Sequence, residues 1–233
     1  MIITVEKIAL IVAGGTGKRM KSLVPKQFML LKGIPVLMHT IHKFHRYDTG
    51  MRIILVLPGD QVATWKDLCE KNSFNISHEM VTGGETRFHS IQKNLDRIPE
   101  QCLVAVHDGV RPLVSMDTIH RCFTVAGENG NAVPCLEIPE TLRIMDEKGN
   151  RPVDRTKYRL IQTPQVFISG MLKEAYQQEY HPCFTDDASV VESRGYSIHL
   201  VDGNSENLKI TLKQDLGIAE FLLQGMQDNQ YHL

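Results

Sequence analysis

Short apolar runs alternate with segments of helical periodicity along the first part of the chain. The apolar runs predict strands near residues 7–12, 52–57, 76–81, 103–107 and 131–136. Helices are predicted between them, over 35–44, 60–71, 86–95 and 115–127. Pro35 suits the first turn of a helix, and Val36, Ile41 and Phe44 would form its inner face. This alternation predicts an α/β fold with a doubly wound, mostly parallel sheet.

Residues 139–158 break the alternation. Polar and apolar residues alternate over 141–145, a turn cluster follows at 146–150, and 151–154 leads back, which predicts a β-hairpin. A hairpin this short and polar has no core of its own, so we expect it to pack on another subunit. An exposed hairpin on a monomer is the alternative. The chain, residues 1–233, otherwise fits a single domain, with residues 139–158 as its dimerisation arm.

The composition narrows the class of protein. A hydrophobic content of 42% suffices for a core, and 26 basic against 27 acidic residues give a net charge of −1. Neither nucleic acid nor a membrane surface is therefore an expected partner. The apolar run at 8–13 is short and follows Glu6, so it predicts a buried strand and not a signal peptide or membrane span. Five cysteines without a C-x-x-C pair suit a reducing compartment, and we expect a cytoplasmic protein.

The loop after the first strand reads A-G-G-T-G-K-R-M over residues 13–20, and Pro25, Lys26 and Gln27 follow it. Glycines allow backbone N–H groups to approach a polyanion closely, and the cations add charge, so this loop predicts a phosphate site. Arg19 stands where a Walker A loop needs Ser or Thr, and Met20 stands where a dinucleotide loop needs a third small residue. A solvated glycine-rich turn is the alternative for the loop taken alone.

Eight motifs occur in order along the chain: G-G-T-G-K-R-M (14–20), P-K-Q-F (25–28), G-G-E-T-R-F-H-S (83–90), H-D-G-V-R-P (107–112), V-D-R (153–155), Q-T-P-Q-V-F (162–167), T-D-D-A-S (185–189) and N-L-K-I-T (207–211). Together they resemble, nearly from end to end, the 2-C-methyl-D-erythritol 4-phosphate cytidylyltransferase family of the non-mevalonate isoprenoid pathway. The ribitol-5-phosphate cytidylyltransferase family shares most of them. Gly14 and H-D-G-V-R-P lean towards the ribitol phosphate family, whereas T-D-D-A-S and the stretch from V-D-R to T-P-Q-V-F (153–167) lean more strongly towards the methylerythritol family.

The resemblance implies a Rossmann-like nucleotidyltransferase fold with a protruding arm. It also implies an enzyme that transfers CMP from CTP to 2-C-methyl-D-erythritol 4-phosphate, releases pyrophosphate and gives 4-diphosphocytidyl-2-C-methyl-D-erythritol. Ribitol-5-phosphate and hexose-1-phosphate nucleotidyltransferases and a non-catalytic nucleotide sensor are the alternatives. A phosphate monoester has a second pKa of ~6, so the attacking oxygen is ionised at neutral pH and needs no general base. Positioning and cationic stabilisation would then carry the rate.

Site residues for the nucleotide follow from the same resemblance. Arg19 and Lys26 would stabilise the α-phosphate and the leaving group, and Asp108, which ends a buried strand, would face the cleft and bind Mg²⁺. Solvated surface cations and a turn carboxylate are the structural alternatives. Arg87 would orient its loop or reach phosphate, and Thr86 would cap a helix. The CTP-binding set would comprise Ala13, Gly14, Gly15, Gly17, Gly83, Gly84, Glu85, Arg87 and Ser90.

The acceptor phosphate and hydroxyls would be bound by Arg111, Thr141, Arg155, Thr163, Thr185 and Lys209. Arg111 would hold substrate or pair with Asp108. Thr141 and Arg155 lie on the arm, so the resemblance implies a homodimer with exchanged arms, in which they serve the neighbouring active site. The run Thr185-Asp186-Asp187 also matches a helix cap followed by acidic first-turn residues, and this is the role we expect for the two carboxylates.

Overall fold

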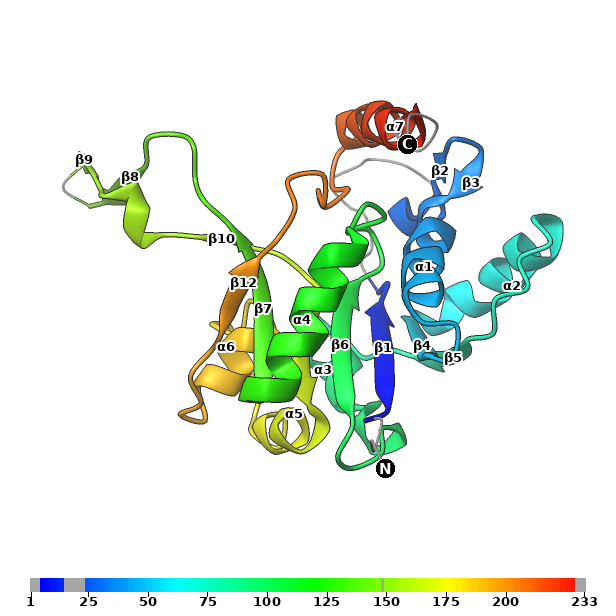
Figure 1. The fold of residues 1–233 in the computed structure, drawn as a ribbon, viewed down its shortest axis with the longest axis horizontal. Helices are drawn as coiled ribbons and strands as arrows, with labels where there is room; N and C mark the ends of the chain where they lie inside the picture. Colours follow the sequence, from blue (N-terminus) through cyan, green and yellow to red (C-terminus); the bar gives the residue numbers. More distant parts are fainter. Residues whose placement is uncertain (1–4, 15–23, 148, 229–233) are drawn as a thin grey trace.

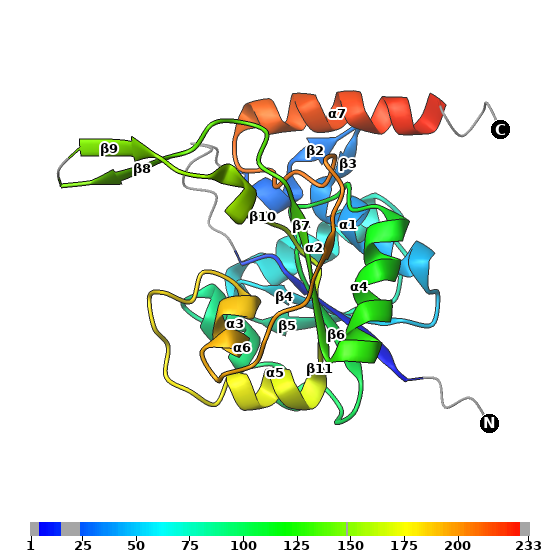
Figure 2. The same ribbon diagram turned by 60° about the vertical axis from the view of Figure 1, so that its left-hand side comes forward.

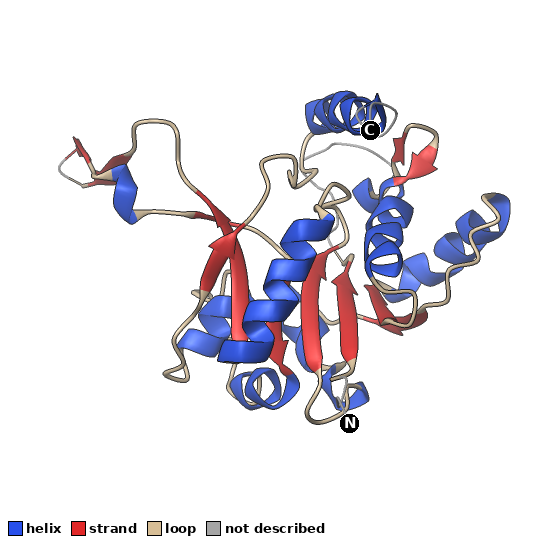
Figure 3. Ribbon diagram, viewed as in Figure 1, coloured by secondary structure: helices blue, strands red, loops and turns tan. Residues whose placement is uncertain are grey.

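A mixed β-sheet with helices on both faces forms the body of the molecule (Figures 1 and 3). The computed structural model describes residues 5–14, 24–147 and 149–228. Within these ranges the sheet has eight strands. Seven of them follow one another in the order β10 (Leu160–Ile161), β7 (Asn131–Leu136), β11 (Gln165–Ile168), β6 (Leu103–Asp108), β1 (Lys7–Val12), β4 (Arg52–Leu57) and β5 (Glu79–Thr82). The eighth strand, β12 (Leu200–Asp202), pairs with β7.

Strands β5, β4, β1 and β6 are parallel to one another, as the alternation predicted. Strand β11 is antiparallel to both β6 and β7. The crossover through α4 (Met116–Asn129) leaves a gap of one strand between β6 and β7, and β11 arrives from the arm to fill it in the opposite direction. The fold class predicted from the sequence is confirmed, and this inserted strand is an addition that the pattern did not indicate.

Side chains alternate between the two faces of the sheet and so build two cores. Ala9 and Ile11 of β1 face α1 (Val36–Tyr47), α2 (Val62–Lys71) and α4, whereas Ile8 and Leu10 face the opposite layer. That layer contains α3 (Arg87–Gln92), α5 (Ser169–Ala175) and α6 (Asp187–Glu192). In Figure 2, α4 lies on one side of the sheet and α3, α5 and α6 lie on the other. Because both faces are covered, the parallel strands read as continuous apolar runs.

The ends of some helices and strands differ from the prediction by a few residues, while one predicted helix cap is present. Pro35 precedes α1 as its N-cap, with φ −53° and ψ 135°, and the helix runs on to Tyr47. Strand β5 begins at Glu79, three residues later than predicted, and the His78 ring just before it contacts the Ile76 carbonyl and the Trp65 indole N–H. Thr86 caps α3 as predicted, since its Oγ1 accepts the His89 N–H at 3.3 Å.

The predicted hairpin is present as β8 (Arg143–Asp146) and β9 (Gly149–Pro152). It extends away from the sheet in Figures 1 and 2, and every residue of both strands is exposed. Two large apolar side chains on it, Ile144 and Met145, are 41% and 71% exposed. The hairpin therefore buries almost no apolar surface against the rest of its own chain. Its use as a dimerisation arm stays a prediction.

Helix α7 (Lys213–Asp228) packs on the hairpin of β2 (Leu30–Leu31) and β3 (Ile34–Pro35). A third apolar cluster, which includes Leu31, Val110 and Ile210, lies beneath it. The Ile210 N–H donates to the Val110 carbonyl at 2.9 Å, which brings the segment before α7 alongside the end of β6. This contact places residue 209 beside residue 108.

None of the five cysteines is in a disulfide. In the part of the chain that the structure describes, no helix combines the length and the apolar character that a membrane crossing needs.

Candidate active site

Two adjoining cavities open at the carboxyl ends of β1 and β6, where ligands bind in open α/β sheets. The first, of about 170 Å³, is lined by residues of the glycine loop, the Lys26 segment and the start of α3. The second, of about 260 Å³, lies between β6, the residues before β11 and the start of α6. Arg87, Asp108 and Lys209 line both cavities. Ligands bound in the two cavities would therefore meet at these three charged side chains.

The structure brings most of the predicted residues to this cleft. The predicted residues that line the first cavity are Ala13, Gly14, Lys26, Gly84, Glu85, Arg87, Ser90, Asp108 and Lys209. Those that line the second are Arg87, Asp108, Arg111, Thr163, Thr185 and Lys209. Gly83 does not line either cavity but packs against Ser90, which lines the first one. Gly15, Gly17 and Arg19 lie outside the residues that the structure describes.

Thr141 and Arg155 lie elsewhere, on the exposed arm and at its base. Arg155 lines a separate cavity of about 600 Å³ together with Glu137 and Glu140, and its guanidinium donates to the Pro139 carbonyl. Within one chain these two residues are not part of the cleft.

The wall between β5 and α3 is built by close backbone contact. The Ser90 hydroxyl accepts the Gly84 N–H at 3.0 Å and lies 3.3 Å from the Gly84 carbonyl. A Cβ at Gly83 would lie 2.8 Å from Ser90 Oγ, and one at Gly84 would lie 2.7 Å from His89 Cβ. Steric exclusion thus explains both glycines, and the Ser90 hydroxyl fixes the loop that they form.

Gln27 fastens the start of the glycine loop to the segment that carries Lys26. Its side chain is fully buried, and Nε2 donates to the Ala13 carbonyl at 2.9 Å and to Gln61 Oε1 at 2.6 Å. Among the described residues its Oε1 atom has no hydrogen-bond partner. Gln27 was not predicted to have a role, although its position directly after Lys26 in P-K-Q-F was the available signal.

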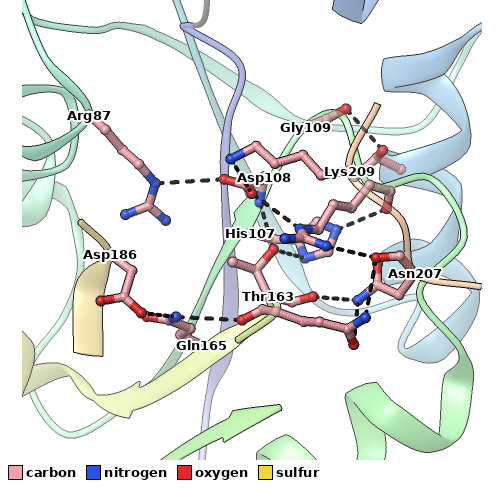
Figure 4. Close-up of polar contacts among 12 residues, drawn as sticks. Arg87, His107, Asp108, Gly109, Thr163, Gln165, Asp186, Asn207 and Lys209 are labelled. Atoms are coloured by element: carbon pink, nitrogen blue, oxygen red, sulfur yellow. Dashed lines mark hydrogen bonds and ion pairs between the residues drawn. The ribbon is translucent and has the colours of Figure 1, made fainter. Parts of the chain in front are cut away.

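Asp108 is the electrostatic centre of the cleft (Figure 4). Oδ2 lies 2.9 Å from Lys209 Nζ and 3.2 Å from Arg111 Nε, and Oδ1 lies 3.6 Å from Arg87 Nε. Burial raises the pKa of this carboxyl, but the three cations outweigh burial and hold the pKa well below its usual range. The carboxylate is therefore ionised throughout the physiological range. Arg111 is paired with Asp108 and also lines the second cavity, so the pairing is compatible with a contact to substrate.

A hydrogen-bonded chain fixes the backbone on either side of Asp108. The Asp108 N–H donates to Thr163 Oγ1 at 3.1 Å, and Thr163 Oγ1 lies 3.0 Å from His107 Nδ1. His107 Nε2 lies 3.1 Å from the Arg111 carbonyl, which can only accept. His107 therefore donates from Nε2 and accepts the Thr163 hydroxyl proton at Nδ1. Since that proton is already used, Thr163 can only accept a hydrogen bond from a substrate hydroxyl.

The acidic run after Thr185 divides into two roles. Asp186, and not Thr185, caps α6, in a capping box with Ser189. Asp187 follows it but is fully buried, with its carboxylate paired to Arg87. Both carboxylates lie at the helix end, as expected: Asp186 takes the capping place of Thr185, and Asp187 is the acidic residue of the first turn, although it also pairs with Arg87.

Two buried amides support the second cavity and were not assigned by sequence reasoning. Gln165 donates to Asp186 Oδ2 at 2.7 Å and accepts the Ala188 N–H at 2.8 Å. Asn207 Nδ2 donates to the Thr163 carbonyl at 2.8 Å. Both residues lie in motifs quoted above, but their partners are distant in the sequence, so only the fold reveals the contacts (Figure 4).

The arrangement suits two phosphorylated ligands. Lys26, Arg87, Arg111 and Lys209 all border the cavities, and only Glu85, Asp108 and Asp186 among the described residues bring negative charge to them. Charge-assisted hydrogen bonds from such cations to phosphate oxygens are the strong class. Held in a fixed cleft, the cations can stabilise charge that develops on a phosphoryl group during transfer.

The sequence of this chain is similar to known cytidylyltransferases over nearly its whole length. The family model of 2-C-methyl-D-erythritol 4-phosphate cytidylyltransferase matches residues 7–225. The enzyme of that name from Bacteroides thetaiotaomicron is 50% identical over 218 residues, which cover 94% of this chain and all of the relative. The one from Bacteroides fragilis is 51% identical over 217 residues, covering 93% and 99%.

Solved structures agree with these relatives. The crystal structure of 2-C-methyl-D-erythritol 4-phosphate cytidylyltransferase from Thermus thermophilus superposes with a TM-score of 0.75 at 31% identity, covering 95% of this chain and all of the other. A 4-diphosphocytidyl-2C-methyl-D-erythritol synthase from Anaerococcus prevotii gives a TM-score of 0.79 at 28% identity, covering 94% and 96%.

The buried His107 generates a prediction about pH. Burial lowers its pKa to about 4, whereas an unfolded histidine has a pKa of ~6.5. The unfolded chain binds the proton first, so the stability due to neutral His107 is complete above about pH 6.5. It is lost as the pH falls towards 4, by about 3 kcal/mol in total. Urea unfolding of wild type and His107→Gln at pH 7 and pH 4.5 should show a smaller pH-dependent loss in the variant.

His120→Gln is the matched control, because His120 is exposed. Its unfolding free energy should follow that of the wild type at both pH values. An identical pH dependence in wild type and His107→Gln would mean that His107 is not held neutral by the fold.

Proposed function

The chain belongs to the 2-C-methyl-D-erythritol 4-phosphate cytidylyltransferase family and is a CTP-dependent nucleotidyltransferase, and from this premise we propose how its residues divide the work. The reaction forms 4-diphosphocytidyl-2-C-methyl-D-erythritol from CTP and methylerythritol phosphate in isoprenoid biosynthesis. Family membership favours this acceptor over ribitol phosphate and favours an enzyme over a nucleotide sensor. The observation that supports the division of roles is the pair of cavities that share Arg87, Asp108 and Lys209.

We assign the first cavity to CTP. Ala13, Gly14, Gly84 and Ser90 offer small side chains and backbone polar groups, which suit a base and ribose. Lys26 borders the same cavity and would face the phosphates, where Arg19 is expected to join it. We assign the second cavity to the acceptor, with Arg111 and Lys209 for its phosphate and Thr163 and Thr185 for its hydroxyls.

The transfer requires two anions to meet. A phosphate oxygen of the acceptor attacks the α-phosphorus of CTP, the new P–O bond forms, and the bond to pyrophosphate breaks. Because the acceptor phosphate is ionised at neutral pH, with a second pKa of ~6, no side chain has to remove a proton. The cations at the junction of the cavities would offset the repulsion and stabilise the leaving group, which is the largest contribution expected in such a site.

Mg²⁺ was predicted with Asp108 as its ligand. Both Asp108 oxygens face cations, and the described residues contain no cluster of three or more His, Cys, Asp or Glu side chains that could hold a metal ion. These residues do not fit a preformed metal site. Mg²⁺ commonly binds through substrate phosphates and water with one or two carboxylates. We therefore propose that the phosphates of CTP and water would supply most of its ligands, and that Asp108 would be the carboxylate of the chain that binds it.

We further propose a homodimer with exchanged arms. The arm carries exposed apolar side chains, Ile144 and Met145, and more of them lie near its base, where Leu160 is 50% exposed. Thr141 and Arg155 lie on this arm and not in the cleft of their own chain, so a neighbouring cleft is the site that they could serve. The unpaired cysteines suit a reducing compartment, and we propose a cytoplasmic location.

Pyrophosphate release is the direct test of the function. The purified protein with CTP and Mg²⁺ should release pyrophosphate with methylerythritol phosphate at a kcat/KM at least about tenfold above that with ribitol phosphate, a difference of about 1.4 kcal/mol in transition-state binding. Activity with ribitol phosphate alone would overturn the assignment of the acceptor. CTP binding without release with either acceptor would overturn the assignment as an enzyme.

The two lysines should separate the chemical step from acceptor binding. Lys26→Ala is expected to lower kcat by about 10²-fold or more while CTP still binds, because a cation acts most strongly on the charge that develops during reaction. Lys209→Ala is expected mainly to raise the KM for methylerythritol phosphate, since that contact exists before and after reaction. Steady-state kinetics and CTP calorimetry measure both effects. Near-normal turnover of Lys26→Ala would remove Lys26 from the mechanism.

Subunit mixing tests whether the arm acts on the neighbour. Arg155→Ala and Lys26→Ala homodimers should each be nearly inactive. A mixed dimer has one site with both residues intact, so random exchange of equal amounts should restore about a quarter of wild-type activity, by the two-fold geometry of the interface. Absence of recovery, once mass spectrometry has confirmed exchange, would mean that Arg155 does not act in the neighbouring subunit.

A further inference from the structure

Asp187 is a fully buried carboxylate that none of the proposed substrate contacts uses. Its Oδ1 and Oδ2 atoms accept from Arg87 Nη1 and Nη2 at 2.7 and 2.6 Å. The Tyr176 hydroxyl donates to Oδ1 at 2.7 Å. Residues 87 and 187 lie at the starts of α3 and α6, which lie on the same face of the sheet (Figure 2).

The surroundings explain how a charge is tolerated there. Two parallel N–H···O bonds between guanidinium and carboxylate are the strong, geometrically specific form of this ion pair. Asp187 is the first residue of α6, where unpaired backbone N–H groups favour negative charge. The Tyr176 ring stacks on Phe88 with centroids 4.7 Å apart, so the hydroxyl that completes the set is itself held by packing.

The pairing with Asp187 determines where Arg87 can act. Each terminal nitrogen donates one of its two N–H groups to Asp187, and Nε lies 3.6 Å from Asp108 Oδ1. The side chain is 27% exposed and borders both cavities. In Figure 4, Arg87 points towards Asp108 from the side opposite to His107 and Asn207. The guanidinium therefore borders both cavities, and its two hydrogen bonds to Asp187 fix the orientation of its plane.

We propose that Asp187, which the Tyr176 hydroxyl holds in place by a hydrogen bond, is a positioning residue for the nucleotidyl transfer and acts through Arg87. This inference rests on the proposed function of the cleft. Asp187 holds Arg87 away from a closer pairing with Asp108, and so leaves Asp108 available to order Arg111 and Lys209 on the acceptor side. A misplacement of about 1 Å in such a site can cost about 10²-fold in rate.

A purely structural role as a link between α3 and α6 is the competing explanation. It predicts that loss of the pair lowers stability and leaves the kinetic constants of the folded enzyme unchanged. The positioning role predicts a lower kcat for the folded enzyme, with smaller changes in both KM values, because the groups that bind substrate are still present but no longer aligned.

The test compares three variants of the full-length enzyme. Asp187→Asn keeps the shape but loses the charge, and its kcat should fall at least about tenfold, with each KM changed by less than about threefold. Tyr176→Phe removes one hydrogen bond, so its kcat should fall less. Val190→Ala is the matched control: Val190 is buried on the same helix, so its substitution should lower the melting temperature and leave kcat unchanged.

Unchanged kinetic constants in both Asp187→Asn and Tyr176→Phe would overturn the proposal, and Tyr176→Phe alone decides it if Asp187→Asn does not fold. A loss of kcat in Val190→Ala equal to that in Asp187→Asn would assign the effect to stability. Arg87→Lys completes a double-mutant cycle with Asp187→Asn. Because Asp187 is proposed to act only through Arg87, the double variant should have a kcat no lower than that of Arg87→Lys alone.

NMR of the arginine side chains separates this proposal from the proposed function. In the wild type, the two hydrogen bonds to Asp187 restrict rotation of the Arg87 guanidinium, so its two Nη resonances should be resolved. In Asp187→Asn they should be averaged. That readout needs no turnover. A wild-type enzyme without activity on methylerythritol phosphate would refute the function, whereas averaged Nη resonances in the wild type would refute the positioning of Arg87.

Discussion

The charge on Asp108 is the constraint around which the cleft is organised. A buried carboxylate is tolerated only when its charge is compensated, and here three cations from three separate segments supply the compensation. Arg87 comes from the start of α3, Arg111 from the turn after β6, and Lys209 from the segment that leads to α7. The pairs with Arg87 and Lys209 therefore link the end of β6 to two other walls of the cleft, whereas the pair with Arg111 is local, three residues along the same turn. Removal of the carboxylate would leave three cations facing one another across two cavities.

The same arrangement explains why phosphorylated ligands suit the site. The Asp108 carboxylate already holds the cations in a shared orientation, so little reorganisation is required when phosphate arrives. The chain behind Asp108 adds rigidity without charge, because His107 is neutral and both of its nitrogens are committed. A charged histidine at this position would add a fourth cation beside the three that Asp108 already balances.

Most of the fold and much of the site could be predicted from the sequence, for one physical reason. Motifs that follow parallel strands must meet at one edge of the sheet, and the start of the glycine loop (Ala13 and Gly14), Gly84 and Asp108 all line the first cavity there. The pair of hydrogen bonds between Arg87 and Asp187 could not be predicted, because each residue begins a helix and the local pattern gives the acidic one a role in the first helical turn. The contacts of Thr163 with His107 and Asn207 were hidden for a related reason, since they join residues more than 40 positions apart. Local patterns report local partners, and buried polar networks are long-range.

The inserted strand β11 has a consequence for how the chain folds. It lies between β6 and β7, yet it is made after both of them and after the whole arm. Until residue 168 is in place, β6 and β7 each present an unpaired edge in the middle of the future sheet. Unpaired edges of apolar strands are templates for pairing with other chains. Because β11 closes contacts across about 60 residues to β6, its docking is a high-contact-order step, of the kind that slows folding. The facing edges of β6 and β7 therefore stay open until residue 168 of the 233 has been made, and an incomplete chain is exposed there to pairing with other chains.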